Sequence, residues 1–153
     1  MEQDLEYRQK IIQEYKQAVL PLLKYLPWME QNAGKAASHN YQGQGLSRNS
    51  ISFPVYDSTV LNFVREASNS SLMNRNYSYV YSRNGIKTHD DERRKIAAAE
   101  LKDWDILCGI LSKYVLSGMT KATVWGEAVQ ENIFVLVLRQ MRKIIEYWDK
   151  DGK

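Results

Sequence analysis

The strongest constraint on the fold is a helical repeat of apolar residues near the C-terminal end of the sequence. Apolar side chains from Ile133 to Trp148 recur at intervals of three and four residues, the spacing that places them on one face of an α-helix. Three further apolar residues widen this stripe: Leu136, Leu138 and Ile145. The pattern therefore predicts a helix over 133–148 that lies either at the centre of the fold or at an interface between two copies of the chain.

Capping residues mark the helices that precede it. Thr88 stands before three acidic residues and then three basic ones in THDDERRK, an order that stabilises the first turn of a helix. The apolar pattern then continues to Gly118, either as one long helix or as two that are broken near residues 102–103. Thr120 predicts the start of a further short helix, which Asn132 can end in a left-handed conformation.

Two more helices are predicted in the N-terminal half. Apolar residues from Asp4 to Leu26 have helical spacing, and Pro21 removes one backbone hydrogen bond, so that it either kinks this helix or begins a new short one. Another helix begins after an N-cap at Asp57 or Ser58. The sequence thus predicts a mainly α-helical single domain, residues 1–153, of five or six helices.

Only a small β element is expected. Residues 32–56 predict a long loop, because this stretch is rich in glycine, serine and asparagine and has no sustained apolar period. Short strands are predicted around residues 50–53 and 76–82. In the second of these, tyrosines occupy every other position, as they do on one side of a β-strand.

Length and composition indicate a soluble protein. A chain of 153 residues can bury a core without disulfides, and its 44% hydrophobic and 25% charged residues are typical of globular domains. The single cysteine, Cys108, lies in an apolar helical pattern, which indicates a buried thiol in a reducing compartment. The N-terminus is acidic and polar, and the longest purely apolar run, 133–138, is too short to cross a bilayer. We therefore expect a cytoplasmic protein without a membrane partner.

The sequence offers few residues for catalysis or metal binding. The two histidines, His39 and His89, belong to no HxxxH or HExxH spacing, and no CxxC pair exists. Asp90, Asp91 and Glu92 are consecutive, so they diverge around a helix and are better explained as stabilising the helix dipole than as a paired acid and base. We therefore expect no enzymatic activity, no cofactor and no metal site.

The segment LMNRNYSYVYSRNG, residues 72–85, is the best candidate for a binding site. Its tyrosines and flanking arginines are residue types that stack on nucleic-acid bases and that anchor protein interfaces. A third interpretation, which we favour, is an edge strand that packs its tyrosines onto the helices. The candidate binding residues are Arg75, Tyr77, Tyr79, Tyr81 and Arg83.

Nucleic acid remains an alternative partner. Residues 35–88 hold six of the 21 lysines and arginines but only two of the 18 acids, so the net positive charge of +3 resides in the middle of the chain. The two helical segments joined near Gly118 have the outline of a helix-turn-helix, although the apolar face of the second segment favours a packed hairpin. The residues of this alternative are Arg48, Arg75, Arg83, Lys87 and Lys121.

Over residues 60–148, several segments resemble those of a group of small uncharacterised proteins from Gram-positive gut bacteria and their mobile elements. The segments are LMNRNYSYVYSR, HDDERRKI, LCGILSKYVLSGMTKATVWGEAV, IFVLVLRQM and KIIEYWD. The resemblance brings no established activity, so no site residue follows from it. It implies an accessory role such as regulation, interference with host defence or aid to transfer. We therefore expect a non-enzymatic interaction or regulatory protein that binds a protein partner or forms a homodimer.

Overall fold

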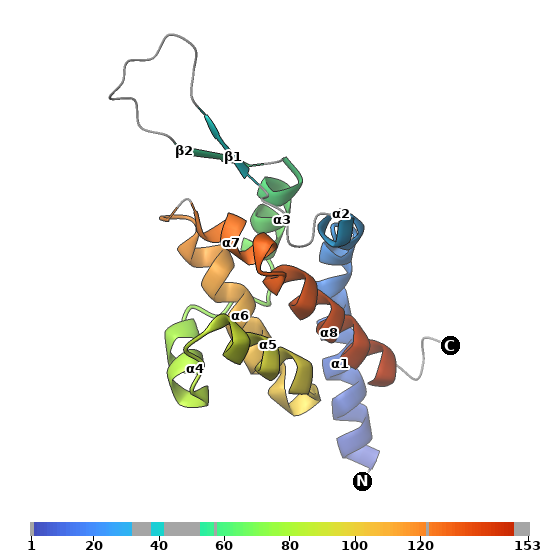
Figure 1. Ribbon diagram of the computed structural model, residues 1–153. Helices are drawn as coiled ribbons and strands as arrows, with labels where there is room; N and C mark the ends of the chain where they lie inside the picture. Colours follow the sequence, from blue (N-terminus) through green and yellow to red (C-terminus); the bar gives the residue numbers. More distant parts are fainter. Residues whose placement is uncertain (1, 32–37, 42–52, 57, 122, 149–153) are drawn as a thin grey trace.

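The computed structural model describes residues 2–31, 38–41, 53–56, 58–121 and 123–148, and within these ranges it is mainly helical (Figure 1). This confirms the predicted fold class. Eight α-helices are present in the described ranges, more than the five or six that were predicted. They are α1 (Glu2–Leu23), α2 (Leu26–Gln31), α3 (Ser58–Ser68), α4 (Tyr77–Asn84), α5 (His89–Ala98), α6 (Trp104–Ser117), α7 (Val124–Gln130) and α8 (Ile133–Trp148).

Helix α8 is the central element, as its apolar stripe predicts. It packs against α1, α2, α5, α6 and α7, and in Figure 1 it runs alongside α1 with α5 and α6 on its other side. Half of its residues are buried in a hydrophobic cluster that receives side chains from seven of the eight helices, among them Val19, Met29, Phe63, Ile96, Leu111, Val129 and Phe134. Burial of this apolar stripe stabilises the fold, and the stripe can be recognised in the sequence.

The capping signals place the start of α5 and the junction between α7 and α8 correctly, but the cap predicted at Thr120 is wrong, because α7 begins at Val124, directly after Thr123. The side-chain oxygen of Thr88 accepts a hydrogen bond from the backbone N–H of Asp91 at 3.1 Å, and the Asp91 carboxylate accepts one from the backbone N–H of Thr88 at 3.2 Å. This reciprocal capping box satisfies two N–H groups that a helix start leaves unpaired. Asn132 has a positive φ of 64° between α7 and α8, as predicted. The chain is also broken between α5 and α6, where residues Leu101–Asp103 form a 3₁₀ turn, η1.

Near the N-terminus, the segment around Pro21 forms two helices rather than one kinked helix. Pro21 lies in the last turn of α1, and the short helix α2 begins at Leu26. A proline in this position removes a backbone hydrogen bond where the helix is about to end.

The predicted loop at 32–56 carries more regular structure than expected at its two ends. Strand β1 (Ser38–Tyr41) pairs antiparallel with β2 (Phe53–Tyr56), in a register that places Ser38 opposite Tyr56 and Tyr41 opposite Phe53. The strand predicted around 50–53 overlaps β2 only at Phe53, because residues 50–52 lie outside the described residues. In Figure 1 the paired strands project from the helices next to α3.

The strand predicted at residues 76–82 is wrong, because Tyr77–Asn84 forms helix α4. A short alternation of tyrosines does not fix the strand period, since residues four apart also share one face of a helix. Contact with a remote segment explains the helical outcome. Val80 packs against Gly109 of α6 so closely that a Cβ atom at position 109 would lie 2.7 Å from the Cγ1 atom of Val80. Because Gly109 has no side chain, α4 can lie directly on α6.

Candidate functional site

The helical form of α4 separates Tyr79 from Tyr77 and Tyr81, although all three were predicted to share one face. Tyr79 points outward and is 64% exposed, Tyr77 is half-buried, and Tyr81 turns toward α5 and α6. Arg75 and Arg83 are both exposed. The strand-based geometry of this site is therefore wrong, although a binding role for the individual residues stays a prediction.

Tyr79 and Arg83 do share the outer face of α4, because they are four residues apart. They border a small hollow of about 370 Å³ between α4 and the start of α6. The charges that line this hollow are of both signs, since Lys102, Asp103 and Asp105 lie across from Arg83.

The structure does not gather the basic residues of the nucleic-acid alternative into one surface. Arg48 lies outside the described residues, while Arg75, Arg83, Lys87 and Lys121 are exposed. Arg83 shares a hollow with residues at the start of α6, whereas Lys121 follows the end of that helix. The 14 residues of α6 span about 20 Å, so these two cations lie far apart.

The hairpin at Gly118 is packed by its apolar residues. The indole ring of Trp125 lies over Gly118, where a side chain would collide with it, and its Nε1–H donates a hydrogen bond to the Val115 carbonyl at 3.1 Å. Helix α7 also buries Ala128 and Val129. This packing agrees with the hairpin interpretation favoured by the sequence.

Tyr81 instead belongs to a buried polar cluster around Glu92, which we call the Glu92 centre. The Glu92 side chain is almost completely buried. Its carboxylate accepts hydrogen bonds from the hydroxyl of Tyr81 at 2.5 Å and from the hydroxyl of Tyr114 at 2.7 and 2.8 Å. His89 Nδ1 lies 2.8 Å from Glu92 Oε1, and Lys113 Nζ lies 3.7 Å from Oε2. The centre thus joins α4, α5 and α6 through one carboxylate.

His89 extends this cluster to α7. Its Nε2 atom lies 2.8 Å from Oε1 of Glu127, so that both ring nitrogens face carboxylates. Burial alone would lower the pKa of His89, but the hydrogen bond to Glu92 and the charges of Glu92, Glu127 and Glu131 outweigh it and raise this pKa. A protonated ring can donate to both carboxylates at once. Burial, followed by the hydrogen bond to Glu92, likewise raises the pKa of Tyr81 and of Tyr114.

The Glu92 centre was missed because the acids at 90–92 were all attributed to the helix dipole. Asp91 does serve the helix start, but Glu92 faces the core. The available signal was its spacing, because Glu92 precedes the buried Ile96 by one helical turn. With the Glu92 oxygens engaged by tyrosines and histidine, the arrangement is suited to fixing helices rather than to holding a substrate.

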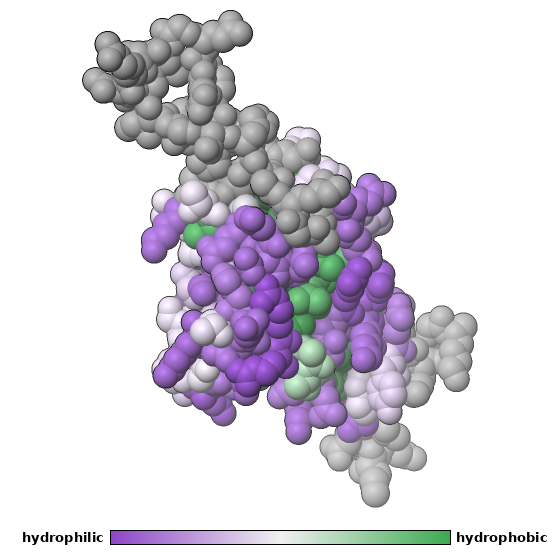
Figure 2. All heavy atoms as spheres, viewed as in Figure 1, coloured by the Kyte–Doolittle hydropathy of each residue, from purple (hydrophilic) through white to green (hydrophobic). Residues whose placement is uncertain are grey.

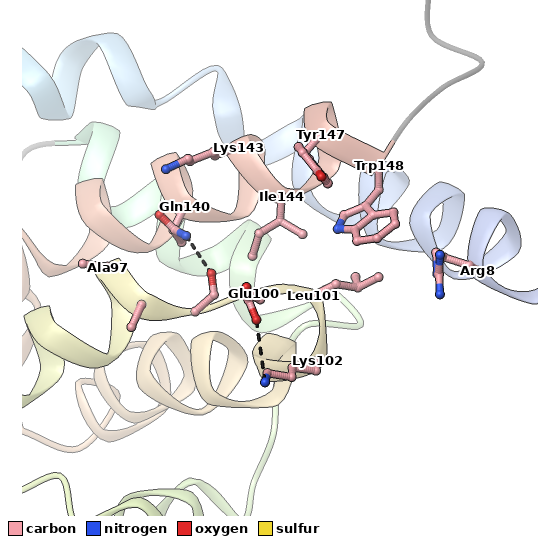
Figure 3. A pocket seen from close by; sticks show the side chains of 12 residues that line it. Arg8, Ala97, Glu100, Leu101, Lys102, Gln140, Lys143, Ile144, Tyr147 and Trp148 are labelled. Atoms are coloured by element: carbon pink, nitrogen blue, oxygen red, sulfur yellow. Dashed lines mark hydrogen bonds and ion pairs between the residues drawn. The ribbon is translucent and has the colours of Figure 1, made fainter. Parts of the chain in front are cut away.

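A second feature is an open groove of about 690 Å³ between the end of α5, η1, α8 and the first part of α1 (Figure 3). Its floor consists of small or apolar residues, including Ala97, Ala98 and Ile144. In Figure 2, hydrophobic spheres gather between α5 and α8 on a face that is otherwise mostly hydrophilic. The floor is held by a hydrogen bond of 2.7 Å from the Gln140 side chain to the Ala99 carbonyl.

Aromatic and cationic side chains form the rim of this groove. The guanidinium of Arg8 lies 4.7 Å from the centre of the Trp148 ring, a cation–π contact that joins α1 to the end of α8. Tyr147 is 67% exposed, and its ring meets Trp148 edge to face at 5.1 Å. Figure 3 shows Lys143 on α8 and Lys102 on η1 at opposite sides of the hollow.

A second hollow of about 440 Å³ adjoins the first between α1 and the start of α6. The two share Arg8, Leu101 and Lys102, which therefore form the ridge between them. Its wall contains Tyr15 stacked on Trp104, with the ring centres 4.1 Å apart and the planes nearly parallel. We call the pair the double groove. Sequence reasoning did not single out its residues, and the only local sign was the run of alanines at 97–99.

The residues that the structure describes contain no group of three or more histidine, cysteine, aspartate or glutamate side chains placed to hold a metal ion. Among the described helices, none combines the length and the apolar character needed to cross a membrane. Comparisons of the chain with protein-family models, with curated proteins and with solved structures gave no match.

Proposed function

We propose that this chain is a non-enzymatic interaction or regulatory protein, and that a protein partner binds in the double groove. The observation that carries the proposal is the combination of an apolar floor with exposed Tyr147 and half-buried Trp148 and Arg8 at its rim. Tryptophan, tyrosine and arginine are the residue types that most often supply the binding energy of protein interfaces. The resemblance to proteins of mobile elements extends the proposal to an accessory partner, including a component of host defence.

Site-specific photo-crosslinking tests this proposal with a matched control. A benzophenone amino acid replaces Tyr147 in one variant and Tyr79 in another, two tyrosines of nearly equal exposure in different hollows. We expect irradiation of cells that produce the variants to yield a defined adduct from position 147 only, with the partner identified by mass spectrometry. Adducts from position 79 alone, or from neither position, would contradict the proposal.

Nucleic-acid binding is the second candidate, because Arg75, Arg83, Lys87 and Lys121 are all exposed. It predicts salt-sensitive retention of the protein on DNA or RNA, weakened by Arg75→Ala combined with Arg83→Ala. Absence of retention at low salt would eliminate this candidate.

A further inference from the structure

We infer that the segment bound by the double groove is acidic at its centre, with one carboxylate between two apolar anchor side chains. The inference rests on the proposed function and specifies the chemistry of the protein partner. It follows from the order in which apolar surface and charge alternate along the groove.

Two separate apolar hollows call for two anchors. The first hollow offers Ile144 and the alanines of α5, and the second offers Ile11 and the stacked Trp104. The ridge between them prevents one side chain from filling both. A segment that follows the groove therefore buries one apolar side chain on each side of the ridge, where each removes apolar surface from water.

Charge on the ridge selects the residue between the anchors. Of the three residues shared by the hollows, Arg8 and Lys102 are cations and Leu101 is neutral. A carboxylate that crosses the ridge meets both cations. The ion pair between Lys102 and Glu100 does not prevent this, because its atoms are 3.7 Å apart and both side chains are more than 70% exposed. Such a surface pair is weak and exchanges readily.

The flanking charges favour the ridge over either hollow as the place for the acid. Asp105 lines the second hollow, where a carboxylate meets like charge, and Glu100 lines the first hollow, where it opposes the attraction of Lys143. A nucleic-acid strand would bring phosphates at regular intervals toward both of these acids and would have no side chains for the hollows. Charge complementarity therefore favours a peptide with a single central acid over a polyanion.

The test uses random peptides displayed on phage, selected on the purified full-length chain and measured singly as fluorescein-labelled peptides by anisotropy. We expect the enriched sequences to share an aspartate or glutamate between two apolar residues. Replacing that acid with lysine should weaken binding about tenfold, as expected when an exposed attraction becomes a repulsion. Lys102→Glu should reverse this preference, and Arg8→Glu should do the same from the other side of the ridge.

Lys121→Glu is the matched control, because it reverses an exposed lysine outside the double groove. It should leave the preference for a central acid unchanged. Selected peptides without a central acid, or a preference that survives Lys102→Glu and Arg8→Glu, would overturn the inference. If crosslinking from position 147 succeeds while the peptides show no such preference, or none is selected, only this inference fails. If crosslinking from position 147 fails, both the proposed function and the inference that rests on it fail.

Discussion

Replacing Glu92 with glutamine should destabilise the protein more than an isosteric change at any other charged residue that the structure describes. The carboxylate receives hydrogen bonds from two tyrosine hydroxyls, and His89 and Lys113 lie close to it. Glutamine keeps the shape but exchanges one acceptor oxygen for an NH₂ group. The hydroxyl proton of Tyr81 or Tyr114 then loses its acceptor in a buried site.

The expected loss follows from the burial of the centre. Removing one partner of a buried ionic cluster costs about 3–5 kcal/mol, whereas a single hydrogen bond to a charged group contributes about 1.5–3 kcal/mol. Because the hydrogen bonds at Glu92 share one carboxylate, their contributions do not add. We therefore expect the free energy of unfolding to fall by about 3 kcal/mol, a large part of the roughly 5–15 kcal/mol typical of a globular protein.

Urea unfolding at neutral pH measures this loss, and NMR titration of His89 provides an independent readout. The pKa of His89 should fall in Glu92→Gln, since the hydrogen bond to Glu92 is the largest of the effects that raise it. Glu127→Gln is the control, because it removes the exposed carboxylate on the other ring nitrogen and should cost no more than about 1 kcal/mol. A loss below about 1 kcal/mol for Glu92→Gln, with the His89 pKa unchanged, would refute this account of the centre.

Three further predictions concern neighbouring parts of the core. The pKa of His89 in the folded protein is raised above its ordinary 6.5, so the stabilisation that this residue provides is complete below pH 6.5 and is lost as pH rises through the folded pKa. The difference in unfolding free energy between wild type and His89→Gln, measured in urea, should therefore shrink with rising pH. A difference that grows with rising pH would contradict this prediction. Gly118→Ala should displace Trp125, break its hydrogen bond to Val115 and lower the unfolding free energy by about 1–3 kcal/mol, with a shift in tryptophan fluorescence emission. An unchanged emission spectrum and an unchanged stability would disprove the packing of Trp125 on Gly118. Burial, aided by the charge of Asp105, raises the pKa of Cys108 to about 12, so iodoacetamide should label it only after unfolding, and rapid labelling of the native protein would be inconsistent with this site.

Elements that are specified by local chemistry were predictable from the sequence. The caps at Thr88 and Asn132 depend on a side chain and its own backbone neighbours, so no remote contact is needed to set them. The helix over 133–148 was predictable because its apolar stripe is long enough to fix the period. Helix α4 was not, because its short alternation fits two periods and Gly109 of a different helix permits its packing.

The candidate site was harder to predict than the fold because its residues come from distant parts of the chain. Arg8, Lys102 and Trp148 line one hollow only after α1, η1 and α8 have packed, and only Trp148 belongs to a local pattern, the apolar repeat over 133–148. The Glu92 centre had one local sign, the helical spacing to Ile96, but its function as a junction depends on tyrosines from α4 and α6. Charge counting over consecutive residues therefore could not distinguish the buried Glu92 from Asp91, which caps the helix, or from Asp90, which pairs with Arg93 at the surface.

Helix α5 contributes to both the Glu92 centre and the double groove, one at each of its ends. Its first turn carries Glu92 into the core, where tyrosines from two helices fix its position, while its last turn presents Ala97 and Ala98 at the surface beside α8. The small side chains leave the groove open without exposing the core, because Ile96 and Ala99 remain buried at neighbouring positions. Stability and binding should therefore respond to different substitutions: Glu92→Gln should weaken the fold, whereas Lys102→Glu should change only which peptide binds. A protein in which both substitutions acted mainly on stability would have an ordinary packing gap at this place rather than a binding groove.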